Sequence, residues 1–155
     1  MTIEEFTTLL QPVTGAIRGR AVDDTLAGLL KRDFPPGGAT FDAIEQACHD
    51  GIAAGWMCNH GAPGRRYGRV IEAGEATAGL SVDVVELIDI VGPHHRHPTG
   101  EICMVMPVTA GARFDGHGRG WCVYPPGSAH HPTVTGGEAV VLYMLPGGEI
   151  EFTGQ

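Results

Sequence analysis

The sequence predicts a mainly β protein, a barrel of short strands with a helical segment at its N-terminus. Glycine and proline are abundant, with 24 and 11 among 155 residues, so tight turns are frequent. Apolar residues recur at helical spacings up to about residue 55, and afterwards they form short runs bounded by Gly or Pro. The length fits one domain with one core. We therefore expect residues 1–55 to form a helical extension and residues 56–155 to form the barrel.

Three helices are expected before residue 55. Thr2 and Glu5 form a capping-box pattern that begins the first helix. The second starts after Asp23 and ends at the PPGG stretch of residues 35–38. Thr40 is expected to cap the third, which runs to about residue 54. Each helix has one apolar stripe, formed in turn by Phe6, Leu9 and Leu10, by Leu26, Leu29 and Leu30, and by Phe41, Ile44, Ala47 and Cys48.

Six segments after residue 55 are predicted to be strands, and the last is expected to close the barrel. They are residues 67–73, 81–91, 101–108, 121–124, 139–145 and 149–152.

The third of these strands has two apolar faces. Its outward face needs a cover, which either the N-terminal helices or a second subunit can provide, and it consists of Ile102, Met104 and Met106. This need favours a homodimer or a higher homo-oligomer.

Net charge and cysteine content limit the expected classes of binding partner and the expected cellular location. The net charge is −8, which opposes binding to phosphate backbones and anionic lipid, so neither nucleic acid nor a membrane is an expected partner. The first residues lack a basic stretch and a long apolar run, so we expect a cytoplasmic protein without a signal peptide. None of the four cysteines forms a CxxC pair, which favours reduced thiols in the core.

The segment GPHHRHPTGE, residues 92–101, has the spacing of a metal site. His95 and His97 share one face of a strand, and Glu101 can join them after a short turn. His130, in the segment PPGSAH of residues 125–130, can come from a neighbouring strand. Three imidazoles and one carboxylate suit one divalent transition metal, namely Fe, Mn, Zn, Ni or Co. The alternative is a histidine-rich surface loop without an ion.

Two further histidines flank this set. Alternation turns His94 and His131 away from the expected metal, although His131 is the alternative to His130 as a ligand.

The pattern HxH-x3-E followed by P-x-G-x-x-H resembles the two signature motifs of the cupin superfamily. His95, His97 and Glu101 match the first motif, and His130 matches the second. The departures affect turn residues, such as Asp89 where the family has glycine. The resemblance implies a double-stranded β-helix, or jelly roll, that holds one metal ion.

The whole chain is similar to the 4-hydroxylaminobenzoate lyase family of bacterial nitroaromatic degradation. The similarity lies in MTIEEFTTLLQPV, GIAAGWMC, SVDVVELIDIVGPHHRHPTGEI and GSAHHPTVTGGEAVVLYMLP. It implies that 4-hydroxylaminobenzoate is converted to 3,4-dihydroxybenzoate (protocatechuate) and ammonia without a redox cofactor. The same ligands would serve an Fe(II) cupin dioxygenase that acts on a small aromatic or thiol substrate. A non-catalytic small-molecule-binding cupin and a sugar isomerase are further alternatives.

Candidate catalytic and substrate-binding residues lie on the predicted strands. Glu86 interrupts an apolar face, so it is either a general acid/base in the pocket or an outward residue. Glu101 is a candidate for catalysis as well as for metal binding.

An arginine is expected to bind the carboxylate of an aromatic substrate, because the guanidinium group can donate two hydrogen bonds to it. Among the arginines around the first strand, Arg69 is favoured and Arg66 is next, with Arg65 beside them. Tyr143 is a candidate to reach the substrate, and core packing is its alternative role.

Overall fold

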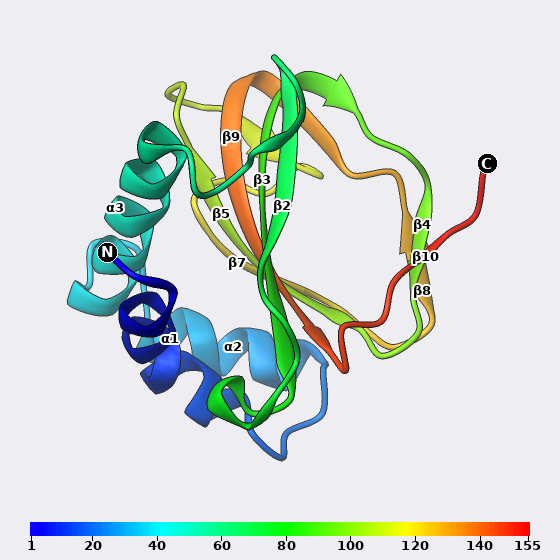
Figure 1. Ribbon diagram of the computed structural model, residues 1–155. Helices are drawn as coiled ribbons and strands as arrows, with labels where there is room; N and C mark the ends of the chain where they lie inside the picture. Colours follow the sequence, from blue (N-terminus) through cyan, green and yellow to red (C-terminus); the bar gives the residue numbers. More distant parts are fainter.

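Three layers make up the structure, a computed structural model that describes all residues 1–155. Three helices cover one face of a large β-sheet, and a small sheet lies against the other face (Figure 1). The N-terminus belongs to the helical layer, whereas the C-terminus leaves from the small sheet.

The helices are α1 (Ile3–Ile17), α2 (Asp24–Asp33) and α3 (Ala39–Ala54). The predicted capping box is present, since the side chains of Thr2 and Glu5 each accept the backbone N–H of the other residue. Asp23 caps α2 through the N–H of Leu26. The predicted cap of α3 is wrong: Gly38 occupies the N-cap position, and Thr40 lies within the first turn.

The large sheet has the strand order β1-β2-β3-β9-β5-β7, with β6 paired to β9, and the small sheet has the order β10-β4-β8. Each predicted strand segment overlaps a strand of the structure, but β9 starts earlier than expected. The strands are β1 (His60–Ala62), β2 (Arg65–Ile71), β3 (Leu80–Val91), β4 (His95–His97), β5 (Glu101–Pro107), β6 (Arg113–Phe114), β7 (Gly120–Tyr124), β8 (Ser128–His130), β9 (Thr133–Pro146) and β10 (Glu151–Phe152).

The predicted cupin jelly roll is confirmed, with one correction. β10 pairs with β4 in the small sheet, so hydrogen bonding does not continue into the large sheet and the barrel stays open. The three motif histidines lie in short strands of the small sheet, β4 and β8, which face the long strands of the large sheet (Figure 1), and Glu101 begins β5 of the large sheet.

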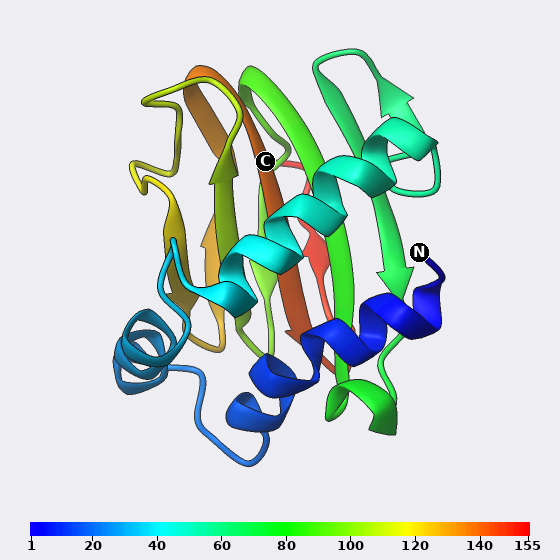
Figure 2. The ribbon, with the colours of Figure 1, turned by 90° about the vertical axis from the view of Figure 1, so that its left-hand side faces the viewer.

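A hydrophobic core joins the helices to the large sheet. The outward face of β5 lies in this core, because Ile102, Met104 and Met106 are fully buried with side chains of α1 and α3. Figure 2 shows these two helices crossing the strands on that side. The helices therefore cover the outward apolar face of β5. This face gives no support for a dimer.

A second apolar cluster lies on the opposite face of the large sheet and includes Cys103, Val105 and Val141. All four cysteines are buried free thiols, as expected. No helix is both long enough and apolar enough to cross a membrane.

Leu142 offers a test of the core between helices and sheet. It is fully buried and lies opposite Val84 on β3 and Met104 on β5. Leu142→Ala should lower the free energy of unfolding by about 2–5 kcal/mol, because it leaves a cavity in a packed interior. Urea denaturation measures the loss. Val108→Ala, at a side chain 49% exposed, is the control and should change stability by less than about 0.5 kcal/mol.

Candidate metal centre

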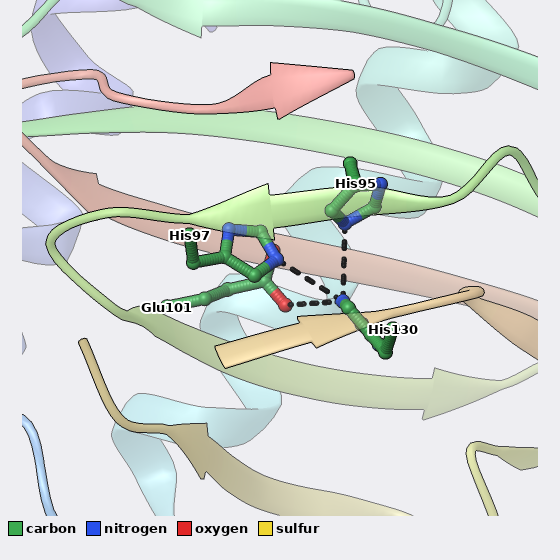
Figure 3. A group of neighbouring side chains, drawn as sticks. All are labelled: His95, His97, Glu101 and His130. Carbon is green, nitrogen blue, oxygen red and sulfur yellow. Dashed lines mark hydrogen bonds and ion pairs between the residues drawn. The ribbon is translucent and has the colours of Figure 1, made fainter. Parts of the chain in front are cut away.

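Four side chains converge between the two sheets, as the motifs predicted. His95 and His97 extend from β4, and His130 extends from β8 (Figure 3). The antiparallel register sets His95 directly opposite His130, so their side chains meet on one face. Glu101 completes the group from the start of β5, and all four ligand atoms lie within 4.8 Å of one another.

The spacing of these atoms matches a coordination sphere. The Nε2 atom of His130 lies 3.0 Å from the Nε2 atoms of both His95 and His97. Oε2 of Glu101 lies 3.0 Å from His97 Nε2, and Oε1 lies 3.6 Å from His130 Nε2. With metal–ligand bonds of about 2.1 Å, neighbouring donor atoms are expected about 3.0–3.4 Å apart. These residues could therefore hold one metal ion.

A glycine turn brings the carboxylate back to the histidines. Gly100 has φ +91°, and its N–H donates to the carbonyl of His97. A Cβ atom at this position would lie 2.8 Å from a methyl group of Val22 and 2.9 Å from the carbonyl oxygen of Tyr124. Only glycine fits both the conformation and the space, so the turn between β4 and β5 depends on it.

The hydrogen bonds of the outer nitrogens fix the imidazole tautomers. Nδ1 of His95 lies 3.2 Å from the carbonyl of Pro93, which only accepts, so this nitrogen carries the proton. Nδ1 of His130 donates to Oδ2 of Asp115 at 2.6 Å. Both Nε2 atoms therefore present lone pairs to each other at 3.0 Å. A cation between them turns this repulsion into attraction.

His97 is the most deeply buried imidazole of the group. Its side chain is fully buried, and its Nδ1 is a buried polar atom without a hydrogen-bond partner. Coordination of Nε2 would offset the cost of burying this ring.

The pKa values follow from burial. Burial, and then the neighbouring histidines, lower the pKa of His95 to about 4 and that of His97 to about 3. These imidazoles are therefore neutral at pH 7, and the close contact between His97 and Glu101 is not a salt bridge. Burial raises the pKa of Glu101 to about 7, against a hydrogen bond that the Cys103 thiol donates at 2.9 Å.

Asp115 orients the ligand His130. Its carboxylate accepts hydrogen bonds from His130 Nδ1, from the Tyr124 hydroxyl at 2.6 Å and from the Thr133 N–H at 2.8 Å. Burial opposes its ionisation, but the three hydrogen bonds outweigh burial and lower its pKa. The sequence did not reveal this role, because Asp115 lies in a Gly-rich loop, and its Asp-Gly pair indicates only a turn.

A cavity of about 240 Å³ opens beside the metal centre, between the two sheets. Three of the four candidate ligands line it: His95, Glu101 and His130. The rest of its wall is mostly apolar or aromatic and includes Val85, Leu87, Phe114, Val141, Ile150 and Phe152. Such a cavity suits one aromatic ring with a polar group directed at the centre.

The C-terminal segment forms one side of this cavity. The ring of Phe152 on β10 lies edge-on to His95, with 5.6 Å between ring centroids. An ion pair of 3.3 Å between Glu151 and Arg96 joins β10 to β4. This segment therefore helps to separate the centre from solvent.

Tyr143 lines the cavity on β9, and its hydroxyl has no hydrogen-bond partner in the chain. Burial raises its pKa well above the usual value, so the phenol stays protonated. It can therefore donate a hydrogen bond to a bound molecule.

Glu86 does not reach the cavity. The register of β3 directs Val85 and Leu87 toward the cavity, so Glu86 shares the opposite face with Val84, which packs in the helix-side core. Burial raises the pKa of Glu86, and Arg66 and His49 of α3 oppose that shift. The structure thus follows the alternative in which Glu86 lies outside.

Neither favoured arginine lines the cavity. Arg66 lies opposite Glu86 on the face turned away from the cavity. Arg69 is held by its own neighbours, since it donates to both oxygens of Asp83 at 3.2 and 3.3 Å and to the carbonyl of Gly148. Arg65 is the arginine that lines the cavity. The sequence shows neither the register that turns Arg66 away nor the contacts that hold Arg69.

His94 and His131 lie outside the ligand group, as alternation predicted. Their rings are 4.8 Å apart, and Nδ1 of His94 contacts the hydroxyl of Thr153 at 2.5 Å. His131 contacts the carbonyl of Gly92 and does not replace His130.

A family model and two relatives match most of the chain. The model of the family "PnbB: 4-hydroxylaminobenzoate lyase" matches residues 8–152. A 4-hydroxylaminobenzoate lyase of Nocardioides sp. (strain LMS-CY) is 31% identical over 91% of this chain and 89% of its own. One from Pseudomonas putida is 29% identical over 88% and 87%. Among solved structures, an RmlC-like cupin protein of Ralstonia eutropha JMP134 is 14% identical, with a TM-score of 0.43 over 59% of this chain and 60% of its own.

Asp115→Asn tests the orientation of His130. Asparagine tolerates the left-handed conformation of this residue, whose φ is +49°, but removes the negative charge that faces His130. Affinity for Zn²⁺ should fall about 10- to 100-fold, as is usual when a partner of a metal-bound histidine is lost. Competition with a chromogenic chelator measures it.

Asp89→Asn is the matched control for this experiment. Asp89 also has a positive φ, of 38°, and its side chain accepts a backbone N–H, that of Gly137. Unchanged Zn²⁺ affinity in Asp115→Asn, or an equal loss in Asp89→Asn, would contradict the role given to Asp115.

Proposed function

Because the chain belongs to the 4-hydroxylaminobenzoate lyase family, we propose that it is a metal-dependent lyase that forms 3,4-dihydroxybenzoate and ammonia from 4-hydroxylaminobenzoate. The observation that supports this proposal most directly is the group of three histidines and Glu101 that borders an apolar cavity. That combination would hold a metal ion for the N–OH group beside an apolar space for the ring.

The proposed reaction consumes one water molecule and is redox-neutral. The N–O bond breaks, and the leaving oxygen keeps the electron pair of that bond. The ring supplies electron density to nitrogen as the bond breaks. Water adds to the ring carbon beside the one that carries nitrogen and loses a proton. A second water then adds to the carbon of the resulting C=N bond, ammonia leaves, and loss of the proton from the neighbouring ring carbon to the new oxygen restores the aromatic ring. Since the broken N–O bond returns one water, the net change is addition of water and loss of ammonia.

The metal ligands in this proposal are His95, His97, Glu101 and His130. A divalent Fe, Mn, Zn, Ni or Co ion bound there would supply Lewis acidity toward the leaving oxygen. Burial keeps the imidazoles of His95 and His97 neutral and ready to coordinate. Glu101 contributes the negative charge that balances the cation, and this is the catalytic part we assign to it.

The remaining groups act on the substrate directly. The Tyr143 hydroxyl, protonated and without a partner, donates a hydrogen bond to the N–OH group and stabilises the charge that develops on its oxygen. The apolar wall holds the ring and keeps bulk water from its other positions. Phe114 and Phe152 supply the aromatic faces of that wall.

Anaerobic turnover tests the function. Metal-replete protein and 4-hydroxylaminobenzoate, incubated without oxygen, should give ammonia and 3,4-dihydroxybenzoate in equal amounts. His97→Ala should lose both bound metal and turnover, because it removes a buried ligand. His117→Ala, an exposed histidine outside the group, is the control and should retain both. Product that forms only when air is admitted would favour a dioxygenase, and no product under either condition would favour a binding protein.

Tyr143→Phe tests the proposed hydrogen-bond donor. We expect kcat to fall about 100-fold at unchanged metal content, the usual effect of removing a group that moves or donates a proton. His117→Ala, at an exposed residue outside the ligand group and the cavity wall, is again the control. Steady-state kinetics with metal analysis of each variant decides; wild-type kcat in Tyr143→Phe would exclude this role.

A further inference from the structure

We infer that Arg65 binds the carboxylate of the aromatic substrate, on the cavity wall that β2 contributes. This inference rests on the proposed function, because it presumes that the reacting group of the substrate lies at the metal centre. It assigns carboxylate recognition to a residue other than the two that the sequence favoured.

Fifteen residues line the cavity, and Arg65 is the only arginine or lysine among them. Its guanidinium has no carboxylate within ion-pair distance, whereas Arg69 and Arg119 each contact two acidic side chains. An unpaired guanidinium is common on a surface. One that also borders an apolar cavity beside a candidate metal site is suited to an anionic ligand.

The register of β2 explains why this arginine reaches the cavity. Arg65 lies opposite Leu87 of β3, and Tyr67 lies opposite Val85. All four of these residues line the cavity, so the odd-numbered residues at this end of β2 face inward. Arg66 has the other parity and faces away.

The backbone at Arg65 is fixed by a tight hairpin between β1 and β2. Gly61 has φ +89°, and a Cβ atom there would lie 2.2 Å from the carbonyl oxygen of Arg65. The hairpin therefore requires glycine at that position. A hydrogen bond of 3.0 Å from the N–H of Ile88 to the carbonyl of Gly64 ties the turn to β3.

The side chain of Arg65 is also directed. Its guanidinium carbon lies 5.8 Å from the centroid of the Tyr67 ring, within the range of a cation–π interaction. Tyr67 thus holds the positive group beside the cavity while both of its edges stay free to donate hydrogen bonds. A carboxylate can accept two of them side by side.

Charge makes this position selective. The chain has a net charge of −8, and the metal centre contributes the carboxylate of Glu101 to the same cavity. With a divalent ion bound, the metal centre is positive as well, so Arg65 supplies the second positive group of the cavity and holds the carboxylate when the reacting group occupies the metal centre. The ring then spans the apolar residues between Arg65 and the metal centre, which orients the reacting group.

Direct binding tests this inference without turnover. Isothermal titration calorimetry with metal-replete protein compares 4-hydroxybenzoate with its uncharged analogue 4-hydroxybenzamide at pH 7.5. The wild type should bind the acid at least about tenfold more tightly than the amide. Arg65→Ala should weaken binding of the acid about 10- to 100-fold and leave binding of the amide within about twofold.

Two further variants make the comparison specific. Arg66→Ala removes the same charge one residue away, on the opposite face of β2, and should keep the preference for the acid. Arg65→Lys should restore only part of the preference, because lysine keeps the charge but not the paired donors. Metal content and circular dichroism should be the same in all variants.

Three outcomes would overturn the assignment: no preference for the acid in the wild type, an undiminished preference in Arg65→Ala, or an equal loss in Arg66→Ala. Failure of the proposed function gives a different result. In that case anaerobic incubation yields no ammonia, while the preference for the acid and its dependence on Arg65 persist.

Discussion

The mutual repulsion of donor atoms at the centre of the fold is the constraint on which the site depends. The Nε2 atoms of His95 and His97, both neutral, lie 3.0 Å from Nε2 of His130, and the buried carboxyl group of Glu101 lies next to them. The surrounding structure supplies what holds them there. The β4–β8 register opposes His95 to His130, and Asp115 keeps the outer nitrogen of His130 protonated. Such an arrangement costs stability without a cation and favours one that binds.

The two faces of the large sheet have different roles: one packs against the helices and contributes stability, and the other borders the cavity and the metal centre. Residues of one parity pack against α1 and α3, and residues of the other parity face the small sheet. On β3 the boundary falls between neighbours, since Val84 lies in the helix-side core and Val85 lines the cavity. The helices therefore take no part in the cavity, but they bury the face whose exposure would otherwise require another subunit.

Local spacing made the metal ligands predictable, and the sheet register made the other residues unpredictable. His95 and His97 share a face in any strand, and Gly100 favours the turn that returns Glu101. The strand segments were also predictable, because apolar runs were bounded by turn residues. Which face of a strand points inward was not predictable in the same way. Alternation in the sequence defines two faces but does not identify the inner one. That ambiguity governed Glu86 and Arg66, whereas Arg69 has the parity of Arg65 and is held away from the cavity by Asp83.

Loop residues escaped prediction for a related reason. Asp115 acts through a left-handed backbone conformation that points one carboxylate at three donors from different segments, and no local pattern encodes those distances. The same holds for Arg65, whose direction depends on a hairpin and on the ring of Tyr67. The ligands at the centre are set by short-range spacing, whereas recognition of the rest of the molecule is set by strand register and loops. A chain of this fold can therefore keep its metal centre while changes at the cavity wall alter which small molecule it accepts.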